Sequence, residues 1–240
     1  MRQITLMLCA FLIGATVSVN AQKTIEEGVI KMEITEVSSD NPQIAAQLEM
    51  MKGTKTEYYF NKEKSLVVAN MMGGMMKMQN LVNNSDEHLT LLMEMMGQKI
   101  MIESTKAERD KFEAEQNAEM PELDIVYDEN DKKTILGYEC IKATVTSPDP
   151  STPMNFSMYV SKEIKASNKM VQGLQTIDLE GFPLEITIDM EQMKLTATTQ
   201  ELNDSVDSSV FEINTNGYQK MSFEEFQQSM GAMGGGGMGF

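Results

Sequence analysis

Residues 184–199 read LEITIDMEQMKLTATT and contain the clearest secondary-structure signal of the chain. Apolar residues occupy every second position in two runs, first from Leu184 to Met190 and then from Met193 to Ala197, with polar residues between them. A period of two is typical of strands that bury one face. Because Glu191-Gln192 separates the two runs, the stretch predicts a hairpin of an antiparallel sheet whose apolar face must be covered.

The same alternation recurs along the chain. We expect further strands at residues 30–34, 54–60, 65–72, 88–96, 99–104, 125–127, 134–146 and 156–161. Polar or glycine-containing turns at 61–63, 97–98 and 128–131 join neighbouring strands into hairpins. Many short strands with one apolar face predict an antiparallel sheet, and therefore an α+β fold dominated by β structure.

Three segments predict helices that could cover this sheet. Residues 41–53 begin with Asn-Pro and carry one apolar face. Residues 106–120 are rich in Glu, Lys and Ala, which predicts a solvated helix or a mobile insert. Ser222 and Glu225 form a capping box at the start of a last helix, which we expect to dock on the core. A flexible tail rich in glycine and methionine follows at residues 234–240.

The beginning of the chain predicts export. A short positive segment precedes the apolar run of residues 4–15, and Val19-Asn20-Ala21 presents small residues before Gln22, as in a signal peptide. The run is too short to span a bilayer, and no second run follows. We therefore expect a signal peptide at 1–21, one curved-sheet domain at 22–221, and a C-terminal helix and tail at 222–240. The mature protein is expected to be periplasmic or extracellular, without a transmembrane segment.

Composition excludes several classes of partner. The 240 residues include 36 acidic and 20 basic side chains, for a net charge of −16, which disfavours nucleic-acid phosphates and anionic membrane surfaces. One His and two Cys exclude zinc sites rich in either residue. Cys9 lies in the predicted signal, and Cys140 is expected to be a small buried apolar residue.

The chain contains no catalytic or nucleotide-binding motif that we recognise. The GxSxG, GxGxxG, phosphate-loop and HExxH patterns are all absent. Any Ser-His-Asp or Cys-His site would have to use His88, which is expected at the surface at the start of a strand. We therefore predict that the protein is not an enzyme and requires no cofactor.

Methionine is the unusual component, with 24 residues that gather in clusters. As a flexible apolar side chain, methionine can fill a core or re-pack around varied ligands. On the second interpretation, a sheet face lined with methionine would suit acyl chains or apolar peptides. The predicted ligand-binding residues are Met71, Met75, Met93, Met95, Phe156, Met158, Ile186 and Ile188.

Thioether sulfurs also bind Cu(I) and Ag(I), which gives an alternative interpretation of the same clusters. The candidate ligands straddle two glycines that allow the chain to bend, and they are Met71, Met72, Met75 and Met76, with Met233 and Met238 as further sulfurs. Exported copper proteins of this kind usually add His or Cys, so this alternative ranks below the apolar surface.

The second half resembles a known group of proteins. The segments GYECIKA (137–143) and GFPLE (181–185), with 159–164 and 206–218, resemble exported proteins of Gram-negative bacteria that are grouped as domains of unknown function. The resemblance covers roughly residues 126–221. These families are similar in fold to the periplasmic lipoprotein carriers of the LolA type. The resemblance implies a half-barrel sheet whose helix-covered concave face holds acyl chains, and it supplies no catalytic residues.

Together these observations predict a curved antiparallel sheet with a few covering helices. The predicted function is an exported, non-catalytic binding protein that holds a lipid or lipoprotein acyl chain in the concave face. Two alternatives remain open, a methionine-based Cu(I)/Ag(I) protein of the cell envelope and an envelope protein that binds a partner through residues 222–240.

Overall fold

The alternating stretch forms the predicted hairpin in the computed structural model. Its two strands are β10 (Phe182–Met190) and β11 (Met193–Asn203), which pair antiparallel. Ile186 lies opposite Ala197, so the apolar residues of both strands share one face of the sheet.

The structure describes residues 24–116, 123–147, 155–171, 173–174, 177–190 and 193–232. The predicted signal peptide, the tail at 234–240 and the turn at 191–192 lie outside these ranges and stay predictions. The remaining elements, in chain order, are β1 (Gly28–Ser38), α1 (Pro42–Glu49), β2 (Lys55–Phe60), β3 (Lys64–Met71), η1 (Met72–Gly74), β4 (Met76–Asn83), β5 (His88–Met95), β6 (Gln98–Ser104), α2 (Lys106–Gln116), β7 (Asp124–Ile135), β8 (Tyr138–Thr146), β9 (Asn155–Ser161), η3 (Asn168–Met170), η4 (Ser208–Phe211), β12 (Gln219–Ser222) and α3 (Phe223–Ala232).

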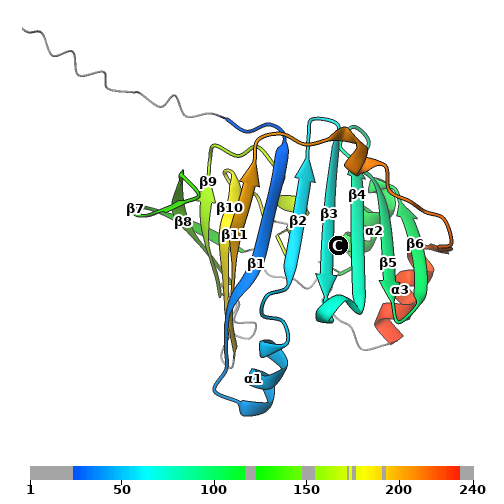
Figure 1. Ribbon diagram of the computed structural model, residues 1–240, viewed down its shortest axis with the longest axis horizontal. Helices are drawn as coiled ribbons and strands as arrows, with labels where there is room; N and C mark the ends of the chain where they lie inside the picture. Colours follow the sequence, from blue (N-terminus) through cyan, green and yellow to red (C-terminus); the bar gives the residue numbers. More distant parts are fainter. Residues whose placement is uncertain are drawn as a thin grey trace, which may run out of the picture.

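The described residues form one sheet of twelve strands in the order β12-β6-β5-β4-β3-β2-β1-β11-β10-β9-β8-β7 (Figure 1). β1 lies in the middle and joins two antiparallel meanders, β2 to β6 on one side and β7 to β11 on the other. Only the short strand β12 pairs parallel, with β6. The sheet curves strongly and stays open, which confirms the predicted β-dominated α+β fold with a curved antiparallel sheet.

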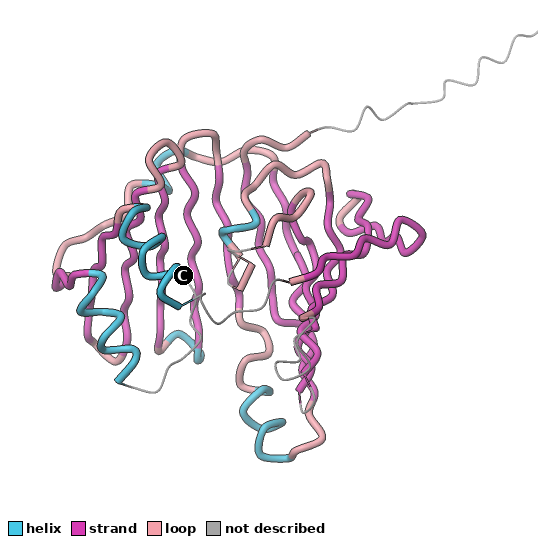
Figure 2. The backbone as a smooth tube through the Cα atoms, turned by 180° about the vertical axis from the view of Figure 1, so that it is seen from behind, coloured by secondary structure: helices cyan, strands magenta, loops and turns pink. Residues whose placement is uncertain are grey.

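Two helices cover one face of the β4–β6 half of this sheet, here called the inner face (Figure 2). Phe226 of α3 is buried against the apolar residues of β5 and β6. Phe112 of α2 meets Phe223 of α3 edge to face, with 5.7 Å between the ring centroids. The last helix therefore docks on the sheet, as its apolar stripe predicts, and helix α1 extends beyond the sheet near the end of β1 (Figure 1).

The main core lies in the other half of the molecule. It combines buried residues of β1, β2, β3, β8, β9 and β10 with the chain segment that precedes β10. Met158, Val160 and Leu184 are fully buried there. Tyr58 and Phe182 pack edge to face, with 5.6 Å between the ring centroids. Most of the apolar surface that stabilises the fold is therefore concentrated around β8 to β10.

The capping predictions for the helices are correct. Asn41 Oδ1 accepts a hydrogen bond from the backbone N–H of Gln43 at 2.9 Å, as expected for the first helix. Ser222 and Glu225 form the predicted capping box. The backbone N–H of Ser222 donates to Glu225 Oε2, and the backbone N–H of Glu225 donates to Ser222 Oγ. The middle helix begins at Lys106 as predicted, and the structure describes it to Gln116.

One strand was absent from the prediction. β4 occupies Met76–Asn83, a stretch that the sequence presents as part of a methionine cluster followed by polar residues. All eight residues of β4 are half-buried. A strand that is neither clearly apolar nor cleanly alternating gives no period-two signal, and its pairing with β3 and β5 fixes it instead.

The predicted turn at residues 128–131 is wrong. β7 runs through it from Asp124 to Ile135, and a bulge between Asp128 and Lys132 accommodates the extra residues. The hairpin turns later, at Leu136-Gly137, where both residues have positive φ. Polar composition indicated a turn, but here the polar residues project from a bulged edge strand whose partner β8 holds it in place.

Candidate functional site

Small residues on β2, β3 and β11, on either side of β1, leave space on the inner face. Ala197 of β11 lies opposite Ile34 of β1, and Thr56 of β2 lies opposite Ala69 of β3. Short side chains at facing positions cannot fill the volume beneath a curved sheet. The sequence therefore builds a hollow between β10 and β4 where a row of Leu or Phe would have closed it.

The hollow is a cavity of about 770 Å³. This volume lies within the range of about 300–1,000 Å³ that is usual for small-molecule sites. Its wall is mostly apolar and includes, from the sheet, Ile34, Thr56, Tyr58, Val67, Ala69, Met71, Met78, Asn80, Ile186, Ile188, Leu195 and Ala197. Met170 and Val171 border it from the η3 segment. Among these described wall residues Tyr58 is the one titratable group, and burial raises the pKa of its phenol.

Exposed methionines form the rim of this cavity. Met50 and Met51 follow helix α1, and Met75 follows the short helix η1. Their exposed fractions are 71%, 44% and 61%, which is unusual for large apolar side chains. Gly73, with positive φ, lies beside them in the wall. The α1 and β3–β4 segments lie at the same end of the sheet (Figure 1), so the cavity opens there between flexible apolar side chains.

The structure brings together four of the eight predicted ligand-binding residues. Met71, Met75, Ile186 and Ile188 all line the cavity. They come from β3, the β3–β4 connection and β10, which lie on opposite sides of β1 and β2 in the sheet.

The other four predicted residues lie elsewhere on the inner face. Met158 is fully buried in the main core, and Phe156 packs against that core. Met93 packs against the cluster beneath α3, and Met95 is half-buried at the end of β5. Alternation groups each of these residues with the apolar face of its own strand, but it does not show which face is concave or which part of it is covered.

Several wall residues were not predicted. Ala69, Ala197 and Thr56 are too small to stand out in a search for apolar stripes, and Met78 lies in the unrecognised strand β4. Met50 and Met51 carried the signal that could have been used, since two consecutive methionines end the predicted helix two residues before Gly53.

The predicted Cu(I) ligands are partly neighbours. Met71 lies opposite Met76 across β3 and β4, while Met75 is on the rim. The side chain of Met72 and all of Met233 and Met238 lie outside the described residues. Within the described part of the chain, no group of three or more His, Cys, Asp or Glu side chains could hold a metal ion.

Cys140 is buried, as predicted. Its side chain is fully inaccessible, and burial raises the pKa of the thiol to about 12. A thiol that stays protonated is a poor nucleophile. His88 starts β5 and is half-buried, and its backbone N–H donates to Asp86 Oδ1 at 3.0 Å.

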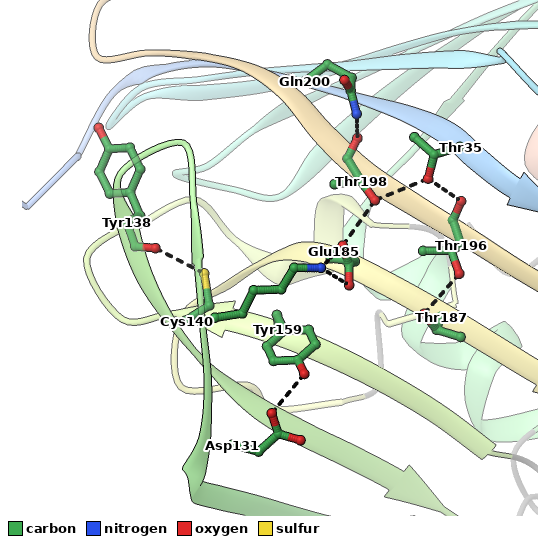
Figure 3. A network of polar contacts seen from close by, with 11 residues as sticks. Thr35, Asp131, Tyr138, Cys140, Tyr159, Glu185, Thr187, Thr196, Thr198 and Gln200 are labelled. Carbon is green, nitrogen blue, oxygen red and sulfur yellow. Dashed lines mark hydrogen bonds and ion pairs between the residues drawn. The ribbon is translucent and has the colours of Figure 1, made fainter.

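The outer face opposite the cavity is polar across β7 to β11 (Figure 3). Lys133 Nζ reaches both oxygens of Glu185, at 2.8 and 2.6 Å, and Thr198 Oγ1 donates to the same carboxylate. Asp131 accepts hydrogen bonds from Tyr159 and Lys142. These contacts link five strands on one face, so the two faces of the curved sheet differ sharply in polarity.

The residues of the GYECIKA and GFPLE segments serve the packing and pairing of the sheet. Cys140 and Ala143 are fully buried, while Lys142 pairs with Asp131 on the bulged strand. Gly181 begins the second segment with φ of 129°, and Glu185 ends it in the ion pair with Lys133. Both segments therefore fix the β7–β10 half of the sheet, and neither contributes a residue to the cavity wall described above.

Comparisons with known proteins give no family. No family model matches the chain, and no curated protein matches it in sequence. The fold aligns with the crystal structure of lipoprotein LppX from Mycobacterium tuberculosis at 10% identity and a TM-score of 0.34, over 77% of this chain and 89% of that chain. LprF from Mycobacterium bovis aligns at 12% identity and a TM-score of 0.30, over 78% and 89% of the two chains. At TM-scores this low, neither similarity carries an argument about function.

Proposed function

We propose that the protein is an exported, non-catalytic binding protein that holds an alkyl chain of a lipid or lipoprotein in the inner-face cavity. The observation that carries this proposal is the apolar cavity of about 770 Å³ with a rim of exposed methionines. Export is supported by the apolar run and small residues before Gln22. Within the described residues, no helix is long and apolar enough to cross a membrane.

The free energy of such binding comes from removing methylene groups from water. Each buried CH₂ contributes about 0.8 kcal/mol, so ten of them contribute about 8 kcal/mol before the costs of association. The cavity wall provides few hydrogen-bonding groups that would have to be desolvated. An alkyl chain therefore fits this wall better than a sugar, a nucleotide or a charged peptide.

Methionine explains how one cavity can accept chains of different lengths. Its unbranched side chain has several rotatable bonds and re-packs at small cost. Met50, Met51 and Met75 on the rim can close over a chain end without fixed geometry. The absence of catalysis is part of the proposal, and it is supported by the protonated state of Cys140 and the apolar character of the wall.

Binding of fatty acids of increasing length to the delipidated protein tests this function. Affinity should rise with each two added carbons, by up to about 15-fold, until the cavity is full. The double variant Met50→Gln/Met51→Gln should weaken binding several-fold, because polar side chains on the rim lose apolar contact. Met96→Gln is the matched control, since Met96 is 88% exposed and does not line the cavity.

Two results would overturn the proposal. One is the lack of saturable binding for any chain length. The other is an equal loss of affinity in the rim variant and in the Met96 control, which would place the alkyl chains on the general surface and not in the cavity.

A second candidate function rests on the register of the methionines. Met76 of β4 lies opposite both Met71 and Met95, and Met78 lies opposite Met93. Thioethers at neighbouring positions on one face could bind Cu(I) or Ag(I). Replacing Met71, Met72, Met75 and Met76 by Leu should abolish Cu(I) binding in competition with a chelator and retain the fold. Unchanged Cu(I) affinity would remove this candidate.

A further inference from the structure

A second, polar cavity adjoins the apolar one. Its volume is about 420 Å³, and its wall includes Asn84, Glu87, Lys106, Arg109, Asp110 and Lys169. Val67, Asn80 and Met170 belong to the walls of both cavities. The polar cavity lies away from the methionine rim, toward the end of the sheet where β4 and β5 are joined. The inner face thus contains an apolar and a polar compartment that lie side by side and share part of their walls.

Asn80 stands where the two compartments meet. Its side-chain oxygen Oδ1 is buried and has no hydrogen-bond partner among the described residues. Leaving a buried acceptor unsatisfied costs about 1–3 kcal/mol, and native proteins rarely do so without a reason. A ligand with a hydroxyl group at this point would supply the missing donor.

The polar compartment carries more positive than negative charge, in a chain whose net charge is −16. Lys106 is neutralised by two carboxylates of the same wall, because its ammonium lies 2.8 Å from Asp110 Oδ2 and 3.9 Å from Glu87 Oε2. Arg109 is held by the carbonyl oxygens of Ser104 and Glu87. Neither Arg109 nor the exposed Lys169 has a carboxylate of the described residues within 4 Å in an ion pair. The three cations and two carboxylates of this wall leave one net positive charge, and Arg109 and Lys169 are its two cations without an ion pair among the described residues.

We propose that this polar compartment binds the head group of the same lipid whose chain fills the apolar cavity, and that the head is an anionic phosphate ester with a free hydroxyl. The phosphate would lie between Lys169 and Arg109, and the hydroxyl would donate to Asn80. Charge-assisted hydrogen bonds favour an anion at such a pair of cations. This inference rests on the proposed function, and it adds the class of the ligand and its direction in the groove.

Three probes with one palmitoyl chain separate the contributions of the head. Palmitoyl lysophosphatidylglycerol has a phosphate and hydroxyls, monopalmitin has hydroxyls and no charge, and methyl palmitate has neither. Affinity, measured below micelle-forming concentrations, should fall in that order. Added salt should weaken the first probe and leave the other two unchanged.

Two variants test whether Lys169 binds the phosphate and whether Asn80 binds the hydroxyl of the head group. Lys169→Gln should lower the affinity for the lysophospholipid about five- to tenfold and leave methyl palmitate unaffected. Lys165→Gln is the matched control, since Lys165 is also exposed but lines neither cavity. Asn80→Leu should weaken both hydroxyl-bearing probes relative to methyl palmitate, with folding checked by chemical denaturation.

The outcomes distinguish this inference from the proposed function. Equal affinities for the three probes, or equal effects of the Lys169 and Lys165 variants, would overturn the head-group site and leave the alkyl site standing. Failure of all three probes to bind would overturn both. Glycerol phosphate without a chain is the last probe, and binding as tight as that of the lysophospholipid would assign the compartment to a free phosphate ester and contradict a joint lipid site.

Discussion

Thr199 carries a buried hydroxyl for which the described residues offer no hydrogen-bond partner. It lies opposite Met32 on the inner face, in apolar surroundings. Because Val has the same shape and no hydroxyl to desolvate, Thr199→Val should raise the free energy of unfolding by about 1 kcal/mol. Urea denaturation measures this. Thr187→Val is the control, since Thr187 Oγ1 bonds Thr196 Oγ1 at 3.1 Å and its loss should give no gain.

Asp131 links the bulged strand β7 to the rest of the sheet. The hydrogen bonds from Lys142 and Tyr159 hold its pKa below the ordinary value of 3.8. A carboxyl whose pKa is lowered by folding stabilises the fold above its unfolded pKa, and that contribution is lost as the pH falls through the folded pKa. Asp131→Asn should therefore be less stable than the wild type at neutral pH, and the difference should shrink as the pH falls below 3.8 and through the lowered pKa of the folded state. A difference that persists in acid would contradict the ion pair as its cause.

The position and burial of a single side chain could be predicted only where the sequence around it shows a regular pattern. That Ile186 and Ile188 share one face follows from alternation, and the buried state of Cys140 follows from the behaviour of a lone thiol as a small apolar residue. The unsatisfied oxygens of Asn80 and Thr199 could not be predicted, because they depend on which strands lie beside them. Met158 shows the same limit, since alternation places it among the apolar residues of its strand, whereas its complete burial in the core depends on the neighbouring strands.

At the scale of single elements, the junction of β9 and β10 depends on Gly181. Its φ is 129°, and a Cβ there would lie 2.3 Å from the carbonyl oxygen of Ser161. Gly181→Ala should therefore cost about 3 kcal/mol or more of unfolding free energy. Gly137→Ala is the matched comparison, because Gly137 also has positive φ but its Cβ would meet nothing within 4 Å. That variant should cost about 1 kcal/mol.

Denaturant unfolding of the two glycine variants compares them directly. Equal losses would show that backbone conformation is the whole effect and that the close approach to Ser161 adds nothing. A larger loss in the Gly181 variant would show that the GFPLE segment is constrained by the packing of two strands.

Elements with a regular period were predictable, and elements set by their neighbours were not. Both β10 and β11 alternate cleanly and were predicted, β10 close to its observed limits, whereas β11 continues beyond the alternating run to Asn203. β4 lacks this period and is a strand because β3 and β5 pair with it on both sides. The polar run in β7 looks like a turn by composition, but a bulge allows it to remain paired with β8.

For the whole molecule, the curved sheet explains why one face is polar and the other contains a cavity. Blocking that cavity tests its role without altering the rim. Ala197→Trp would place a large side chain on its floor, and alkyl affinity should fall at least about tenfold with little loss of stability, because the indole occupies existing space. Lys194→Trp, on the exposed side of the same strand, should leave affinity unchanged.

The cavity itself was beyond prediction from the sequence. An apolar face and a surplus of methionine indicated a binding surface, and four of the proposed residues do meet in the wall. The hollow arises where Thr56 and Ala69, which pair within the β2–β3 hairpin, share a wall with Ala197 of β11, far along the chain. The strand order, which places β1 between the two meanders, brings Ala197 to the same side of the sheet as that hairpin, and local sequence does not show this order.

The most direct test of the central claim is native mass spectrometry of the wild type and the Ala197→Trp variant, purified without detergent and incubated with palmitoyl lysophosphatidylglycerol. If the cavity holds one alkyl chain, the wild type should carry a single saturable adduct that is lost on organic extraction, and the variant should remain unliganded. A wild type without adduct, or adducts of equal amount in both proteins, would contradict it.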